Sequence, residues 1–127
     1  MSDLKPTGAK IKLGKQEYGM RFTINAIDDI QDKFNTPIVD IKKIMMDERN
    51  GIKNLRYLLT LLINEDIDCV NDENKEQGKE EIKHVDEKYV GRHIDTTNIN
   101  EMMTTVFKVF ATGTPEVTDD SPNLKSE

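Results

Sequence analysis

The apolar residues near the N-terminus change their spacing from a period of two to a helical period. Ile11 and Leu13 alternate with lysines, and a second alternating run follows Gly14, which is typical of a β-hairpin. Beyond this run the apolar positions recur at helical spacing. The pattern therefore predicts a hairpin at residues 9–23 that runs almost directly into a helix at about residues 25–35. Because a lone hairpin is marginally stable in water, we expect this helix to cover its apolar face.

Either Thr23 or Asn25 can cap the first predicted helix, since both residue types accept hydrogen bonds from free backbone N–H groups. Pro37, directly after a threonine, favours a second helix start. Asn98 with Glu101 three residues later predicts a capping box. Further apolar residues at helical spacing predict the remaining helices, at about residues 37–48, 52–64, 81–93 and 98–112.

The domain organisation follows from these elements. Residues 9–112 form a single predicted domain, preceded by a flexible arm at residues 1–8 and followed by a disordered tail at residues 113–127. An acidic stretch with few large apolar residues predicts a solvated loop at about residues 66–80. The expected fold is mainly α (α+β), with an N-terminal β-hairpin packed on a bundle of about five helices. A chain of 127 residues suits one such domain.

Charge and apolar length exclude two classes of partner. The formal net charge is −6, and residues 64–88 alone hold ten acids and four lysines. No stretch is basic enough to follow a phosphate backbone, so we expect no nucleic-acid binding. The longest apolar stretch, LRYLLTLLI, is far shorter than the ~20 residues that span a bilayer, so we expect no membrane insertion. With one cysteine and no apolar leader, the sequence favours a cytoplasmic protein.

The sequence carries little catalytic chemistry. The soft metal-ligand candidates are Cys69, His84 and His93, and their spacing matches no zinc pattern. The acidic stretch lacks the turn glycine and terminal glutamate of a calcium loop, and no glycine-rich phosphate loop occurs. All serines lie near the two termini. We therefore expect no metal, no cofactor and no catalytic residue, and a protein that is not an enzyme.

Apolar helix surface is the remaining candidate for function. Met45 and Met46, and likewise Met102 and Met103, are neighbours that point about 100° apart on a helix, so one of each pair is expected to lie off the core. Core filling and partner binding both account for the wide apolar arcs of the helices at 52–64 and 98–112. The partner-binding hypothesis rests on the large apolar residues of these segments: Met46, Leu58, Leu61, Leu62, Met102, Met103, Phe107 and Phe110.

The order of these segments resembles a known family. The hairpin sequence GKQEYGMRFTINA, the segment TPIVDIKKIM, the leucine-rich IKNLRYLLTLLINED and the later IDTTNINE together resemble the tail assembly chaperones of long-tailed bacteriophages and prophages, which are related to gene-transfer-agent tail chaperones. Met20 stands where the family usually has leucine. The resemblance covers about residues 10–112. The positions that carry it are Gly14, Lys15, Tyr18, Arg21, Phe22, Ile24, Asn25, Ala26, Ile94, Asn98, Ile99 and Glu101.

The resemblance implies a function in virion morphogenesis. Such a protein would bind the phage tape-measure protein, keep it soluble, and promote assembly of the tail-tube protein around it. It would act in the cytoplasm of the host bacterium and be absent from the mature virion. The alternatives are a structural tail-completion or connector component that stays in the particle, and a regulator that binds a host factor. Self-association and a longer frameshifted form stay open.

Overall fold

The computed structural model describes residues 9–113. The arm predicted at residues 1–8 and all but the first residue of the tail predicted at 113–127 lie outside the described residues. The described chain is mainly helical with one antiparallel hairpin, which confirms the predicted fold class. Its elements are β1 (Lys10–Leu13), β2 (Gln16–Gly19), α1 (Ile24–Phe34), the 3₁₀ turn η2 (Ile38–Asp40), α2 (Ile41–Met45), α3 (Gly51–Glu76), α4 (Glu87–Arg92) and α5 (Ile99–Gly113).

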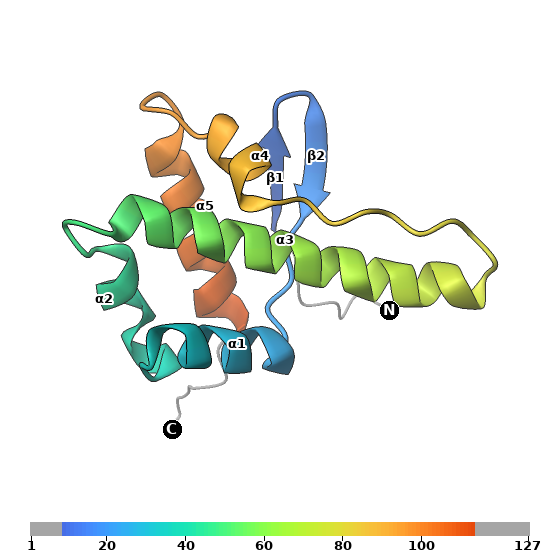
Figure 1. Ribbon diagram of the computed structural model, residues 1–127, viewed down its shortest axis with the longest axis horizontal. Coiled ribbons are helices and arrows are strands. Elements are labelled where there is room, and N and C mark those ends of the chain that lie inside the picture. The colour runs from blue at the N-terminus through green and yellow to red at the C-terminus, as the bar shows by residue number, and fades with distance from the viewer. Residues whose placement is uncertain (1–8, 114–127) are drawn as a thin grey trace, which may run out of the picture.

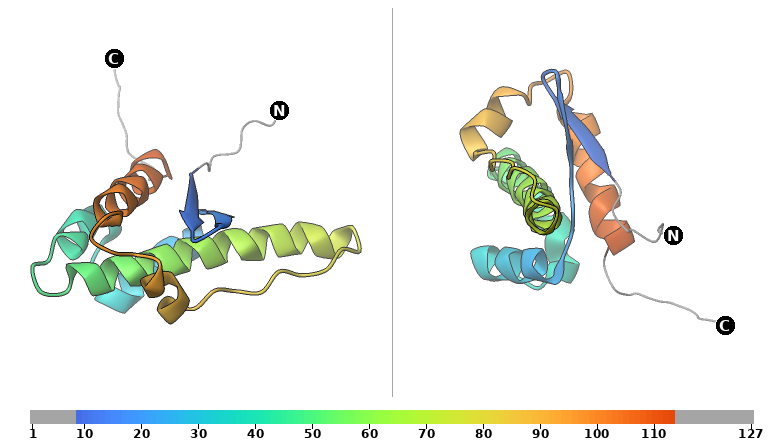
Figure 2. Two further views of the ribbon diagram at one scale, coloured as in Figure 1. Left: turned by 90° about the horizontal axis from the view of Figure 1, so that it is seen from above. Right: turned by 90° about the vertical axis from the view of Figure 1, so that its right-hand side faces the viewer.

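Helix α3 is the centre of the architecture. It crosses the full width of the molecule, with α1 and α2 along one side and the hairpin and α4 along the other, while α5 crosses behind it (Figure 1). The view along α3 shows the hairpin and α5 together on one flank (Figure 2). Leu55, Leu58, Leu59, Leu62 and Ile63 of α3 are all fully buried. This helix therefore supplies the apolar stripe around which the other elements pack.

The predicted hairpin forms but is shorter than expected, because β2 ends at Gly19 and residues 20–23 lie outside the strands. In its register Ile11 lies opposite Tyr18, and Gly14 opens the turn with a positive φ of 67° that favours glycine. Ile11 and Leu13 are buried while the lysines between them are exposed, so one face of β1 packs on the core. The hydroxyl groups of Tyr18 and Tyr89 are 2.9 Å apart, which ties β2 to α4.

The joint between hairpin and α1 is short because Thr23 caps the helix directly. Its side chain accepts a hydrogen bond from the Ala26 N–H at 3.1 Å, and its hydroxyl donates to Glu65 Oε2 at 2.6 Å. Two residues earlier, the Arg21 N–H donates to the Leu62 carbonyl at 3.1 Å, and Arg21 also pairs with Asp66. Arg21 and Thr23, the residues of this joint, thus both bond to α3. These bonds fix the direction in which α1 folds back.

The predicted loop at residues 66–80 is wrong, because α3 continues to Glu76 instead of ending at residue 64. Ile67 is buried and Val70 is half-buried, and both extend the apolar stripe of the first half of α3. Asp66 pairs with Arg21, and the later acids Asp68, Asp72, Glu73 and Glu76 are exposed to solvent, where a helix tolerates them. Only residues 77–80 of the expected loop lie outside the helix.

The predicted helix at 81–93 is also wrong over its first half. Residues 79–86, which we call the strap, run back along α3 without helical structure (Figure 1), and α4 begins only at Glu87. Asp86 caps α4 by accepting a hydrogen bond from the Tyr89 N–H at 2.8 Å. The main-chain groups of Ile82 and Val85 pair with side chains of α3, so they are withdrawn from a helical ladder.

Smaller differences concern helix ends. The helix predicted at 37–48 is a 3₁₀ turn followed by the short α2, and Pro37 precedes the turn in an extended conformation. Helix α5 begins at Ile99, close to the prediction. The predicted capping box is wrong, because the Asn98 side chain bonds to the preceding loop at Asp95 N and the His93 carbonyl. None of the helices in residues 9–113 is both long and apolar enough to cross a membrane.

Candidate functional site

A groove of about 490 Å³ lies between the first turns of α3 and the segment that joins α4 to α5. It combines apolar and cationic side chains in a chain whose formal net charge is −6. We call it the α3 groove. Its lining residues are Arg49, Ile52, Lys53, Arg56, Gly91, Ile94, Asp95, Thr96 and Ile99.

The apolar part of the α3 groove is partly open to solvent. Ile52, on the first turn of α3, is 67% exposed. Ile94 and Ile99 are half-buried and pack against the core from the opposite wall. The Met45 carbonyl lies against Gly51, the first residue of α3. The next residue, Met46, is 59% exposed, so a second exposed apolar side chain lies near this end of α3. Exposed apolar side chains of this size in one region are typical of a protein-binding surface.

Three cations border the apolar residues. Arg49 and Lys53 are exposed, and Arg56 is half-buried. They lie at the N-terminal end of a 26-residue helix, where backbone N–H groups add positive potential, and no side chain caps that end. Asp95 is the one acid in the lining. Hydrogen bonds from the Thr97 hydroxyl and N–H lower the pKa of Asp95, so it stays ionised.

Arg56 lines the α3 groove next to α4. Its side chain lies against Gly91, where a Cβ would come within 3.0 Å of the Arg56 Cδ, so glycine permits this close approach. Arg56 Nε is 3.5 Å from Glu87 Oε1, an ion pair too long for a hydrogen bond. This Nε–H is buried and has no hydrogen-bond acceptor among the described residues.

The α3 groove has the chemistry of a binding surface. An apolar strip flanked by cations suits an amphipathic segment that carries acidic residues beside its apolar face. Within residues 9–113, no group of three or more His, Cys, Asp and Glu side chains could hold a metal ion. Burial raises the pKa of the Cys69 thiol, so this cysteine is a poor nucleophile.

The structure does not gather the predicted partner-binding residues on one surface. Leu58 and Leu62 of α3 and Met102 and Phe110 of α5 are buried in the core, where Phe110 stacks edge-to-face on Phe22 with ring centroids 4.8 Å apart. Core packing covers these four side chains, so they do not lie on the surface where the hypothesis places them.

The other four predicted residues reach the surface to different degrees. Met46 is exposed, while Leu61, Met103 and Phe107 are half-buried at the edge of the core. The expectation that the two methionine pairs each divide between core and surface is borne out in full for the first pair, with Met45 only 1% exposed. None of these four residues lines the α3 groove.

Sequence reasoning therefore missed the residues that line the α3 groove. Ile52 lies on the same apolar stripe of α3 as buried Leu59 and Ile63. The feature that could have identified Ile52 is its place on the first turn of the helix. Residues at the end of a long helix are less completely covered by neighbouring elements than residues at its middle.

Comparison of the chain with protein-family models, with curated proteins and with solved structures found no match.

Proposed function

We propose that this protein is a tail assembly chaperone of a long-tailed phage or prophage, which binds the tape-measure protein through the α3 groove. The observation that carries the proposal is the exposed Ile52 beside Arg49, Lys53 and Arg56 in a chain whose net charge is −6. The order of hairpin and helical sequence motifs, which resembles that family, supports the assignment of the partner. The proposed site of action is the cytoplasm of the host bacterium.

The physical requirements of such a chaperone fit the α3 groove. A tape-measure protein is a long helical chain with apolar stripes, which aggregates unless these stripes are covered during assembly. An open groove with a few apolar contacts covers one stripe without enclosing it, so the complex can dissociate when the tail tube forms. The negative charge of the remaining surface keeps the complex soluble.

The first test is co-expression with a phage tape-measure protein. We expect the two proteins to co-purify at low and moderate salt, and the tape-measure protein to become more soluble. Absence of co-purification would overturn the chaperone assignment. Mass spectrometry of purified virions separates the alternative of a tail-completion or connector component, because stoichiometric retention in the particle is expected only of a structural component.

The second test locates the interface with a matched pair of variants. Ile52→Asp places a charge in the α3 groove, and Ile24→Asp places the same charge on the equally exposed first turn of α1. An acid on the first turn is compatible with the helix dipole, so both variants should fold. We expect Ile52→Asp to abolish co-purification and Ile24→Asp to preserve it. Equal behaviour of the two variants would show that the partner does not use the α3 groove.

A further inference from the structure

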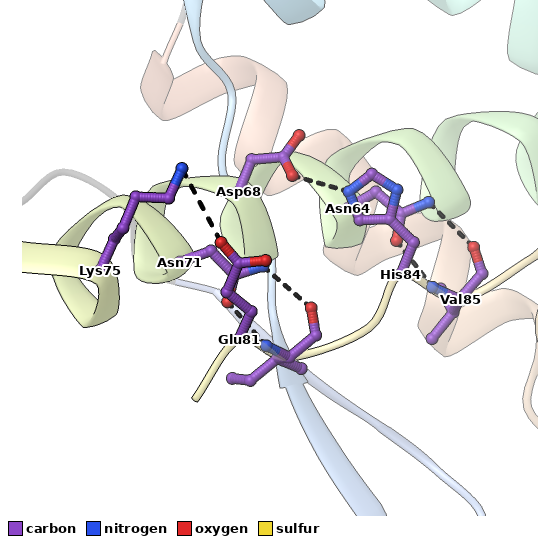
Figure 3. Close-up of polar contacts among 8 residues, drawn as sticks. Asn64, Asp68, Asn71, Lys75, Glu81, His84 and Val85 are labelled. Carbon is purple, nitrogen blue, oxygen red and sulfur yellow. Dashed lines mark hydrogen bonds and ion pairs between the residues drawn. The ribbon is translucent and has the colours of Figure 1, made fainter. Parts of the chain in front are cut away.

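The strap is held on α3 by a repeated side-chain-to-backbone pattern. The Asn64 amide donates to the Val85 carbonyl at 2.9 Å and accepts from the Val85 N–H at 2.8 Å. The Asn71 amide does the same to Ile82, at 2.9 and 2.7 Å. Figure 3 shows both asparagines on the side of α3 that faces the strap. Each asparagine thus satisfies both main-chain groups of one strap residue.

The spacing of the two pairs matches a helix to an extended chain. Asn64 and Asn71 are seven residues apart, which is nearly two turns and about 10.5 Å along one face of a helix. Ile82 and Val85 are three residues apart, which spans about 9.3 Å in a polyproline II segment. The two repeats therefore stay in register, and we call Asn64 and Asn71 the asparagine row.

Side-chain contacts add little to this attachment. Asp68 lies between the two asparagines and its Oδ1 is 2.7 Å from His84 Nε2, in a pair whose side chains are both more than half exposed. Lys75 and Glu81 approach to 3.8 Å at the exposed end of the strap (Figure 3). Residues 79–84 are all exposed, and Val85 is the strap residue that packs against the core. The strap is therefore held mainly through its backbone.

Recognition through the backbone does not depend on the sequence that is bound. Any extended segment without proline at the paired positions presents the same N–H and C=O groups to the asparagine row. Few apolar contacts oppose release of the strap, so its opening is expected to be local and frequent. The surrounding half of α3, residues 64–76, carries six acids and one lysine. A basic segment is therefore favoured over the strap itself, whose residues 79–86 carry three acids and two lysines.

We propose that the asparagine row of α3 is a binding track for an extended basic segment of a partner protein, occupied by the chain's own strap until that segment displaces it. The preferred segment carries a cation immediately before its second paired residue, at the place where His84 meets Asp68. This surface is separate from the α3 groove, and the proposal does not depend on the identity of the partner assigned above.

The test uses the full chain and a synthetic peptide. The peptide has the sequence of residues 79–86 with the changes Glu80→Lys, Glu81→Lys and His84→Lys. The host variant Ile82→Pro removes the N–H that donates to Asn71 while keeping an extended backbone, so it weakens the strap at an exposed position. We expect this variant to bind the peptide about fivefold more tightly than the wild type, the equivalent of one net hydrogen bond.

The control changes the row alone. In the Ile82→Pro background, Asn71→Leu removes one pair of hydrogen bonds but no charge, and should weaken peptide binding at least fivefold. Amide hydrogen exchange measured by NMR should show that the Val85 N–H of the wild type loses protection as the peptide binds. Equal binding with and without Asn71, continued protection of Val85 in the complex, or no binding to the Ile82→Pro variant would each overturn the proposal.

Discussion

Thr23 offers the sharpest test of how the hairpin is joined to α1. Its side chain makes two hydrogen bonds in different directions, one from the Ala26 N–H within the helix start and one to Glu65 on α3. Valine has the same shape and the same preference for the extended backbone that Thr23 adopts, but it makes neither bond. Thr23→Val therefore removes the two bonds without opening a cavity, and Thr23→Ser keeps both.

The expected magnitude follows from the two bonds. Loss of an N-cap costs about 1 kcal/mol. The bond to the Glu65 carboxylate should contribute about 1 kcal/mol, below the usual range for charged partners because the site is only half-buried. The sum is about 2 kcal/mol, which corresponds to a fall in Tm of about 10 °C for a domain of this size. Thr23→Ser should lie within about 0.5 kcal/mol of the wild type.

Urea unfolding followed by circular dichroism measures these differences. Glu65→Gln separates the two bonds, because the amide still accepts from the hydroxyl but without a charge. A double-mutant cycle between Thr23→Val and Glu65→Gln should give a coupling energy near 0.5 kcal/mol or more. If Thr23→Val is as stable as the wild type, or if Thr23→Ser is as unstable as Thr23→Val, the hydroxyl group does not fasten the joint and the reasoning is refuted.

Three further predictions concern other positions. Burial and a hydrogen bond to a neighbouring tyrosine raise the pKa of Tyr18 to about 12. The free energy of unfolding should therefore fall between pH 10 and 12, because the unfolded chain loses a proton that the folded protein keeps. In urea titrations, Tyr18→Phe should flatten this fall. Gly51→Ala places a Cβ 2.7 Å from the Met45 carbonyl oxygen and should cost about 1–3 kcal/mol by the same assay, although alanine is the better helix former. Leu62→Ala should lower the free energy of unfolding by about 2–5 kcal/mol, measured by thermal unfolding, because Leu62 is fully buried. Met46→Ala should change it by less than about 0.5 kcal/mol, because Met46 is exposed. A larger loss for Met46→Ala than for Leu62→Ala would contradict this burial.

The hairpin and its joint to α1 could be predicted because their signals are local. Alternation of Ile11 and Leu13 with lysines, the turn at Gly14, and a capping residue before an apolar helical period all lie within a few residues of the structure that they specify. The choice between Thr23 and Asn25 as the cap could not be made from sequence. Glu65, which lies 42 residues away, binds the Thr23 hydroxyl and thereby supports it as the cap.

The length of α3 was missed because acidic composition was interpreted as loop. A helix needs only one apolar stripe, and Ile67 and Val70 continue that stripe through residues whose other side chains are charged. The strap was missed because its apolar residues suggested a helix where the chain is extended. Ile82 and Val85 have helical spacing, but Asn71 and Asn64 capture their backbone groups, and no local pattern reveals a partner on another element.

The α3 groove could not be predicted from the helical pattern. Apolar spacing shows which side of a helix a residue faces, but not whether another element covers that side at that point along the helix. Ile52 and Leu59 point the same way from α3, yet Leu59 is fully buried and Ile52 is two-thirds exposed. Ile52 lines the α3 groove, whose opposite wall is the α4–α5 segment, whereas Leu59 belongs to the buried core. Apolar residues at the ends of a long central helix are therefore better candidates for partner binding than those at its middle. The same reasoning explains why Leu58 and Leu62, the most hydrophobic choices in the sequence, are core residues: the strongest apolar positions of the longest helix are the first that the fold itself covers.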